Sequence, residues 1–225
     1  MVDCWSPMME RIVFATLKRD KRVVGITSPQ SASGVTSVCE QLARVAGLSG
    51  MRTLLLDLTG RAEVAIPASV WQPGIGNAGQ SIVRDPAGFD RLVARFTRDD
   101  RFKFNNVEGL RLAFAEDLAT YDAIIVDTPP VPTNDLDFLN GAAAAAACDG
   151  AILLCMSGRV SRSELADAQD ALANAQAGLL GIVLNEMQNP TVGSELAREA
   201  RKLRRYLPGV SSWLERRARA SSILN

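Results

Sequence analysis

Residues 23–37 read VVGITSPQSASGVTS, and this stretch decides the predicted fold. Its start, residues 23–27, is an apolar run typical of a buried strand, and the small residues that follow favour a loop before a helix. Small residues let backbone N–H groups turn inward on a phosphate, with a helix N-terminus behind them. We therefore predict a phosphate-binding loop whose nucleotide-contacting residues are Ser31, Ala32, Ser33, Gly34, Val35, Thr36 and Ser37.

This loop lacks the lysine that phosphate-binding loops normally carry. The usual pattern ends in Gly-Lys-Ser/Thr, where the lysine reaches the β- and γ-phosphates and the hydroxyl holds magnesium. Gly34 and Thr36 are in place, but Val35 stands at the lysine position. On the loop alone, a Ser/Gly-rich turn without a ligand is an equally good interpretation.

Four more apolar runs indicate further strands, at residues 53–57, 123–127, 151–155 and 181–185. Continuous apolar runs are typical of strands covered on both faces, as in a parallel sheet flanked by helices. Helical periodicity over 36–48 and 161–177 separates them, the latter opening with a capping box from Ser161 and Glu164. The pattern predicts an α/β fold with a doubly wound, mostly parallel sheet.

The segment 61–106 contains several prolines and glycines. We interpret it as an insertion or a long connection, with one helix around 89–96.

Aspartates end two of the expected strands. Asp127 follows an apolar strand in the Walker B arrangement, which orients magnesium or its water shell. Asp57 ends the run at 53–57, and ligands of such sheets bind at the carboxyl ends of strands. We predict catalytic roles for Asp57 and Asp127, with Thr36 and Asp127 holding Mg²⁺. A helix cap at the strand end is the alternative role for Asp57.

Composition excludes several kinds of site. The 225 residues contain no histidine, which rules out Ser-His-Asp and Cys-His nucleophile systems and His-ligated metals. Lys plus Arg and Asp plus Glu are both 25, so a generally basic nucleic-acid binder is not expected. The four cysteines are widely spaced, which favours reduced thiols of a cytosolic protein.

These motifs resemble those of the bacterial tyrosine autokinases (BY-kinases), within the deviant-Walker P-loop class that includes MinD and ParA. In that family the loop reads like T-S-x-x-P-G-E-G-K-T, and residues 27–36 fall on it, while the family's Walker B motif falls on 121–130. The resemblance covers about residues 20–190. It implies a P-loop NTPase-like fold, ATP or ADP with Mg²⁺ as cofactors, and a position for Asn185 near adenine.

The chain also departs from the family pattern. Val35 replaces the lysine, Ala32 and Ser33 replace a glycine and a glutamate, and Thr59 stands where a second carboxylate is usual. The C-terminal tyrosine cluster is absent, since the chain has only Tyr121 and Tyr206. We therefore expect nucleotide binding to be weak or lost and Tyr206 not to be autophosphorylated. Two arginines are candidates to replace the lysine, Arg61 and Arg159.

Three functions are consistent with this pattern. The leading one, implied by the resemblance, is a degenerate BY-kinase-like protein that regulates or scaffolds exopolysaccharide (capsule-type) biosynthesis and export. The second is an active tyrosine autokinase or ATPase that uses a non-standard cation. The third is a MinD/ParA-like positioning ATPase.

We expect one P-loop domain over residues 1–225 that ends in an amphipathic basic segment at about 194–225. Residues 195–219 carry eight cationic and three anionic side chains, a net charge of +5. That segment is either a solvated terminal helix or a surface attracted to anionic lipid. The resemblance implies an inner-membrane polysaccharide co-polymerase-type partner and a possible homo-oligomer. With no targeting or spanning segment evident, we expect a cytoplasmic protein, either free or peripheral at the inner membrane.

Overall fold

The computed structural model of the chain describes residues 6–17, 20–59, 71–95, 100–132 and 139–186. Met1–Asn185 form one compact unit and Glu186–Asn225 form another. The expected basic segment at about 194–225 lies outside the described residues, so the domain organisation remains a prediction.

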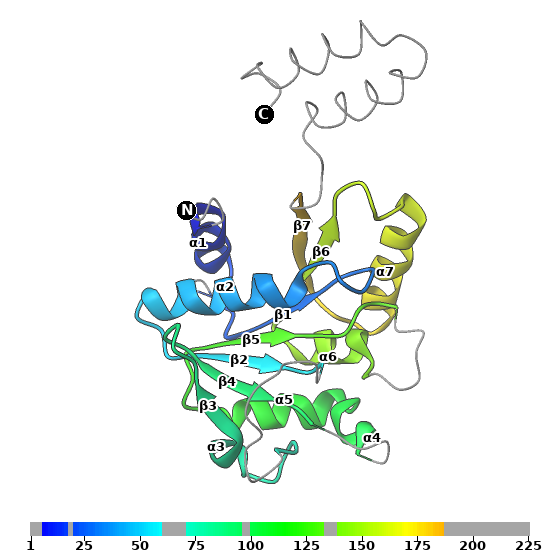
Figure 1. Ribbon diagram of the computed structural model, residues 1–225. Coiled ribbons are helices and arrows are strands. Elements are labelled where there is room, and N and C mark those ends of the chain that lie inside the picture. Colours follow the sequence, from blue (N-terminus) through cyan, green and yellow to red (C-terminus); the bar gives the residue numbers. More distant parts are fainter. Residues whose placement is uncertain (1–5, 18–19, 60–70, 96–99, 133–138, 187–225) are drawn as a thin grey trace, which may run out of the picture. The chain divides into compact units, whose positions relative to one another are not determined.

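The first unit is built on a seven-stranded sheet in the order β3-β4-β2-β5-β1-β6-β7 (Figure 1). Every neighbouring pair is parallel except β3 and β4. The strands are β1 Val23–Thr27, β2 Thr53–Asp57, β3 Ile82–Arg84, β4 Asp90–Val93, β5 Ala123–Asp127, β6 Gly150–Met156 and β7 Leu179–Asn185. The predicted α/β fold with a mostly parallel sheet is confirmed.

Helices cover both faces of this sheet. They are α1 Ser6–Ala15, α2 Val35–Leu48, α3 Ala78–Ser81, α4 Arg101–Phe104, α5 Val107–Ala115, α6 Gly141–Ala147 and α7 Arg162–Asn174. In Figure 1, α1 and α2 lie on one side of the central strands, and α5 and α6 lie on the other. Val23 of β1 is buried in a hydrophobic cluster that includes residues of α5, and its neighbour Val24 is buried in a cluster that includes residues of α2. Both faces of β1 are therefore covered, which is why the run is continuously apolar.

The prediction of a helix around 89–96 is wrong, because strand β4 occupies Asp90–Val93. Asp85 to Gly88 form a turn in which Gly88 N–H donates to the Asp85 carbonyl at 3.0 Å and Gly88 has φ 100°. This turn joins β3 to β4, and β4 pairs with β2. Residues 82–84 and 90–93 are therefore part of the sheet, and the turn chemistry outweighed a weak helical period.

The fifth apolar run also differs from expectation. β7 is paired with β6, but four of its side chains are 38–61% exposed: Leu179, Leu180, Ile182 and Leu184. A continuous apolar run therefore identified the strand but not its burial.

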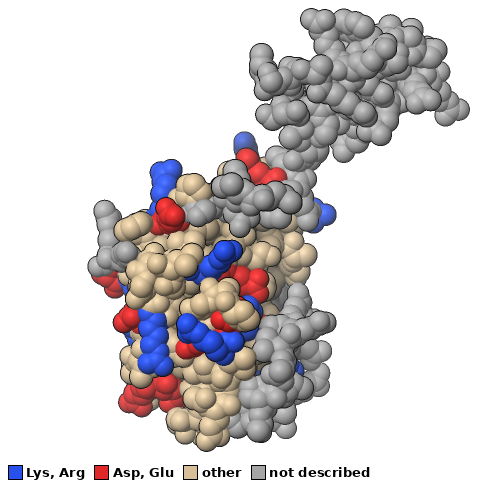
Figure 2. All heavy atoms as spheres, turned by 60° about the vertical axis from the view of Figure 1, so that its left-hand side comes forward, with Lys and Arg blue, Asp and Glu red and all other residues tan. Residues whose placement is uncertain are grey.

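Three further features of the described residues bear on the expectations. Cys39, Cys148 and Cys155 are buried free thiols, as expected. No helix there is both long and apolar enough to cross a membrane. Positive and negative side chains are interspersed on the face that Figure 2 shows.

Gly141 is expected to resist substitution, although it begins a helix of alanines. A Cβ added at Gly141 would collide with the Pro129 carbonyl oxygen and lie 2.9 Å from that of Pro130. Both are backbone atoms just beyond β5, so relief requires the backbone to move. We expect Gly141→Ala to lower the free energy of unfolding by about 1–3 kcal/mol, measured by urea denaturation. Gly79→Ala is the control, because a Cβ there meets no atom within 4 Å; equal losses in both variants would contradict the argument.

Candidate functional site

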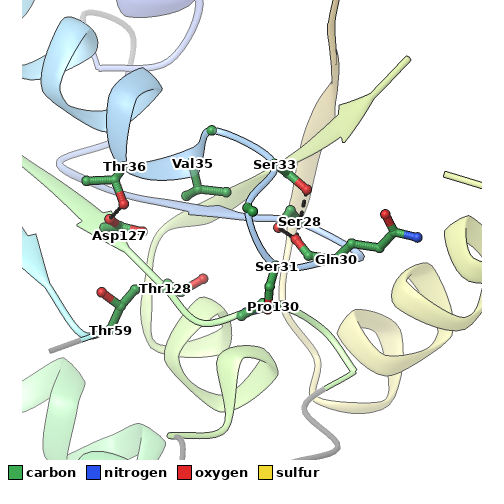
Figure 3. A pocket seen from close by; sticks show the side chains of 12 residues that line it. Ser28, Gln30, Ser31, Ser33, Val35, Thr36, Thr59, Asp127, Thr128 and Pro130 are labelled. Atoms are coloured by element: carbon green, nitrogen blue, oxygen red, sulfur yellow. Dashed lines mark hydrogen bonds between the residues drawn. The ribbon is translucent and has the colours of Figure 1, made fainter. Parts of the chain in front are cut away.

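A cavity of about 260 Å³ opens at the carboxyl ends of β1 and β5 (Figure 3). The chain forms it from the loop after β1, the start of α2 and the residues that end β5. Its lining comprises Ser28, Gln30, Ser31, Ala32, Ser33, Gly34, Val35, Thr36, Thr59, Asp127, Thr128 and Pro130. This is the place where ligands bind in open parallel sheets, because the strand order reverses about β1.

The loop has the backbone shape that a phosphate cradle requires. Gly34 caps α2 with φ 86° and Ala32 has φ 59°, both in the left-handed region. The Ser28 and Ser33 hydroxyls donate to the Gln30 carbonyl oxygen at 2.6 and 2.8 Å. These bonds hold the loop turned over the start of α2, so that the helix N-terminus faces the cavity.

Asn185 also supports this loop. Its side chain is buried and donates from Nδ2 to the Ser33 carbonyl oxygen at 2.9 Å. It does not line the cavity. The structure therefore gives Asn185 a supporting contact with the loop, and its expected place near adenine remains a prediction.

Ala32→Gly is expected to stabilise the protein by about 1 kcal/mol. Alanine carries a steric penalty in the left-handed region that glycine does not, which exceeds glycine's entropic cost in the unfolded chain. Thermal melting followed by circular dichroism measures the change. Gly34→Ala should act in the opposite direction, because its Cβ would lie 2.8 Å from Asn185 Nδ2. A lower melting temperature for Ala32→Gly would show that another interaction fixes the loop.

Thr36 and Asp127 are brought together as predicted. Thr36 Oγ1 donates to Asp127 Oδ2 at 2.6 Å (Figure 3). Asp127 is 1% exposed, and its Oδ1 has no hydrogen-bond partner in the described structure. Burial raises the pKa of Asp127 to about 7, opposed by the Thr36 hydrogen bond and reinforced by the nearby Asp57 charge.

These two side chains fit a magnesium site. Mg²⁺ prefers oxygen ligands and is commonly held by one or two carboxylates together with phosphate oxygens and water. Asp127 Oδ1 is a buried acceptor without a partner, and the Thr36 hydroxyl is beside it. A bound cation would favour the ionised carboxylate that burial alone disfavours.

Asp57 lies next to Asp127 in the sheet but does not line the cavity. The two residues are register partners on β2 and β5. Asp57 Oδ1 accepts hydrogen bonds from Thr59 N–H at 2.7 Å and from Thr59 Oγ1 at 2.6 Å. Thr59 lines the cavity and Asp57 does not, so the cavity wall carries a neutral hydroxyl at this point.

Val35 lies at the centre of the cavity wall (Figure 3). It is partly buried and packs against the hydrophobic cluster that lies between the sheet on one side and helices α1 and α2 on the other. None of the described residues that line the cavity is a lysine or an arginine. Of the two replacement candidates, Arg159 is exposed and does not line the cavity, and Arg61 lies outside the described residues.

The sequence analysis missed one tertiary contact of the loop. Gln30 lines the cavity, and its Nε2 donates to Glu164 Oε1 at 2.6 Å. The other carboxylate oxygen, Glu164 Oε2, accepts hydrogen bonds from Ser161 N–H and Ser161 Oγ, and the predicted capping box of α7 is present. No sequence pattern relates residue 30 to residue 164, so this link could not have been predicted.

Ser37 was predicted to contact nucleotide, but it is exposed and lies outside the cavity lining.

No protein-family model matches the chain. Curated relatives are nevertheless detected along most of its length. It is 27% identical over 187 residues to the tyrosine-protein kinase YwqD of Bacillus subtilis, covering 77% of this chain and 76% of that protein. It is 25% identical over 182 residues to the tyrosine-protein kinase CpsD of Streptococcus agalactiae, covering 75% and 77% respectively.

Solved structures share the fold. The kinase domain of the Escherichia coli tyrosine kinase ETK superposes with a TM-score of 0.62 at 21% identity, covering 77% of this chain and 71% of that one. MinD of Pyrococcus horikoshii, complexed with Mg-ADP, gives 0.55 at 21% identity, covering 74% and 71%. The chain is therefore similar in sequence to proteins named tyrosine-protein kinases, and it shares its fold with a tyrosine-kinase domain and with MinD.

Proposed function

We propose that this protein is a degenerate BY-kinase-like P-loop protein that regulates or scaffolds exopolysaccharide (capsule-type) biosynthesis and export. One observation carries the proposal. The cavity keeps the backbone of a phosphate cradle, but the described residues that line it supply no cation, and Val35 occupies the wall where a lysine would reach phosphate.

The energetic consequence is large. A charge-assisted hydrogen bond to phosphate contributes roughly 1.5–3 kcal/mol to binding. Phosphoryl transfer depends on such cations to stabilise the charge that develops in the transition state, so losing one lowers the rate by orders of magnitude. Thr59 weakens catalysis further, because a hydroxyl that donates to Asp57 cannot replace a carboxylate. We infer weak binding of ATP or ADP with Mg²⁺ and no kinase cycle.

The partner we propose is an inner-membrane polysaccharide co-polymerase-type protein, met at the cytoplasmic face of the membrane. The support is the relationship to proteins named tyrosine-protein kinases, one of them the putative kinase CapB of Staphylococcus aureus.

A complementation experiment separates a scaffold from an enzyme. The gene is deleted in the native host, and exopolysaccharide is measured after return of wild-type protein or Asp127→Asn. A scaffold requires the fold but not turnover, so we expect both versions to restore production. Restoration by wild type alone, at equal protein levels, would contradict the proposal, and unchanged production in the deletion strain would remove the exopolysaccharide role.

Purified protein is expected to show no tyrosine phosphorylation after incubation with Mg-ATP. Mass spectrometry reads phosphotyrosine, and Tyr206→Phe is the control for the one tyrosine of the C-terminal tail. Val35 leaves the γ-phosphate without a cationic side chain among the described residues that line the cavity, and Thr59 stands where a second carboxylate is usual. Stoichiometric phosphate on Tyr206 would overturn this expectation.

The retained Thr36–Asp127 pair favours a second candidate, an active ATPase that uses a non-standard cation. In that case ATP turnover would be measurable and would be lost in Asp127→Asn.

A further inference from the structure

We propose that Glu164, in the first turn of α7, is a positioning residue for the cavity, because it holds Gln30 of the loop at residues 28–34. The inference deepens the proposed function and rests on it for the class of ligand, a nucleoside phosphate. Glu164 does not itself line the cavity, so its role is exerted through the shape of this loop.

Gln30 is the residue about which the loop is folded. Its carbonyl oxygen accepts hydrogen bonds from the Ser28 hydroxyl at 2.6 Å and from the Ser33 hydroxyl at 2.8 Å. Between Gln30 and Ser33 lie two exposed residues, Ser31 and Ala32, and Ala32 is in the left-handed region with φ 59°. The position of Gln30 therefore governs the course of the backbone that leads into α2.

Glu164 holds the Gln30 side chain from a different element of the fold. Gln30 Nε2 donates to Glu164 Oε1 at 2.6 Å, across 134 positions of sequence. In Figure 3 the Gln30 side chain points away from Asp127, and the hydrogen bond takes it to α7. Hydrogen bonds to a charged carboxylate are roughly twice as strong as those between neutral groups. This contact therefore fixes a side chain that is only partly buried.

Glu164 is itself held in place by the start of α7. Its Oε2 accepts hydrogen bonds from Ser161 N–H at 2.8 Å and from Ser161 Oγ at 2.7 Å. These bonds, together with the one from Gln30, lower the pKa of Glu164, so it is a carboxylate at neutral pH. Both oxygens of the side chain are therefore engaged, one by its own helix and the other by the loop.

A second contact ties the other half of the loop. Asn185, at the end of β7, donates to the Ser33 carbonyl oxygen at 2.9 Å. Asn185 thus fixes the half that runs into α2, and Glu164 fixes the half that leaves β1. A loop that is ordered before binding spares the ligand the cost of ordering it. Loss of the Glu164 contact should therefore weaken the binding of phosphate.

Positioning and charge predict opposite effects for the removal of Glu164. A carboxylate near a phosphate site repels the ligand, so a role through charge alone would make removal raise the affinity. A role in positioning makes removal free Gln30 and lower the affinity, although a negative charge is lost. The sign of the change therefore separates the two roles.

Isothermal titration calorimetry of the full chain with Mg-ADP tests the proposal with two variants that both lose the charge. Glu164→Gln keeps an amide that can bond Gln30 and still suits a capping box, so it should bind at least as tightly as wild type. Glu164→Ala should bind roughly 3- to 10-fold more weakly than wild type, the loss expected for one hydrogen bond. Asp167→Ala, which removes an exposed carboxylate from the same helix, should not lower the affinity.

Two results of this titration would overturn the proposal. One is a Glu164→Ala variant that binds as tightly as Glu164→Gln. The other is a wild-type protein that binds no Mg-ADP, which would remove the ligand but leave the scaffold role intact. A double-mutant cycle adds a check of the contact itself. In a Gln30→Leu background, Glu164→Ala should cause no further loss, because both changes remove the same hydrogen bond.

Hydrogen exchange of the backbone amides at residues 30–34 tests the positioning without any ligand. Exchange should be about 5-fold faster in Glu164→Ala than in wild type, because the loop opens locally more often. It should be unchanged in Asp167→Ala, which makes the same chemical change one turn from no loop contact. Unchanged exchange in Glu164→Ala would overturn the proposal whatever the cavity binds.

Discussion

Val35→Lys is expected to raise the affinity of the protein for Mg-ATP by roughly 10- to 150-fold, the equivalent of about 1.5–3 kcal/mol. The other parts of the phosphate cradle are present. Gly34 caps α2 in the left-handed conformation, and Thr36 and Asp127 are hydrogen-bonded at 2.6 Å. Val35 lines the cavity, so a lysine at this position has space to place its ammonium group near phosphate.

Isothermal titration calorimetry measures this change, with Mg-ATP and Mg-ADP as separate ligands. Val35→Met is the matched control, because it lengthens the side chain without adding charge and should leave affinity unchanged. A larger gain for ATP than for ADP would place the new ammonium group at the terminal phosphate. If Val35→Lys folds and still binds no tighter than Val35→Met, the missing lysine is not what limits the site.

The sequence predicted the central strands well for a physical reason. β1, β2 and β5 match the expected bounds at every residue, since each is an apolar run buried on both faces. The same argument failed for β7, which is apolar but lies at the edge of the sheet, because strand order depends on long-range pairing. It failed again at β4, a short strand after a tight turn, where Leu92 and the preceding Phe89 are buried in the core.

The site was predictable where it is local in sequence. The loop residues from Ser31 to Thr36 line one cavity together with Asp127, because strand ends of a parallel sheet meet at one edge. The tertiary support was not predictable. Gln30 binds Glu164 and Asn185 binds Ser33 across more than a hundred residues, and no local pattern encodes either contact.

Asp127→Asn is expected to make the protein more stable at alkaline pH, by up to about 4 kcal/mol in free energy of unfolding. Burial raises the pKa of Asp127 from 3.8 to about 7, a shift of about three units, and each unit corresponds to about 1.4 kcal/mol. Between these two values the folded protein holds a proton that the unfolded chain has lost. Stability therefore falls as pH rises from about 4 to about 7, and the loss remains in full above that range.

Asparagine removes this dependence because it is neutral at every pH and its oxygen can still accept from Thr36. Chemical denaturation at pH 5 and pH 8, in a chelator, should show a difference between Asp127→Asn and wild type that grows with pH. Asp167→Asn, which neutralises an exposed carboxylate on α7, is the control and should show a much smaller change. Added Mg²⁺ should stabilise wild type at pH 8 and leave Asp127→Asn unaffected, since the cation needs the ionised carboxylate. An Asp127→Asn variant less stable than wild type at pH 8 in chelator would mean that the folded protein favours the charged form, contrary to the burial of this side chain.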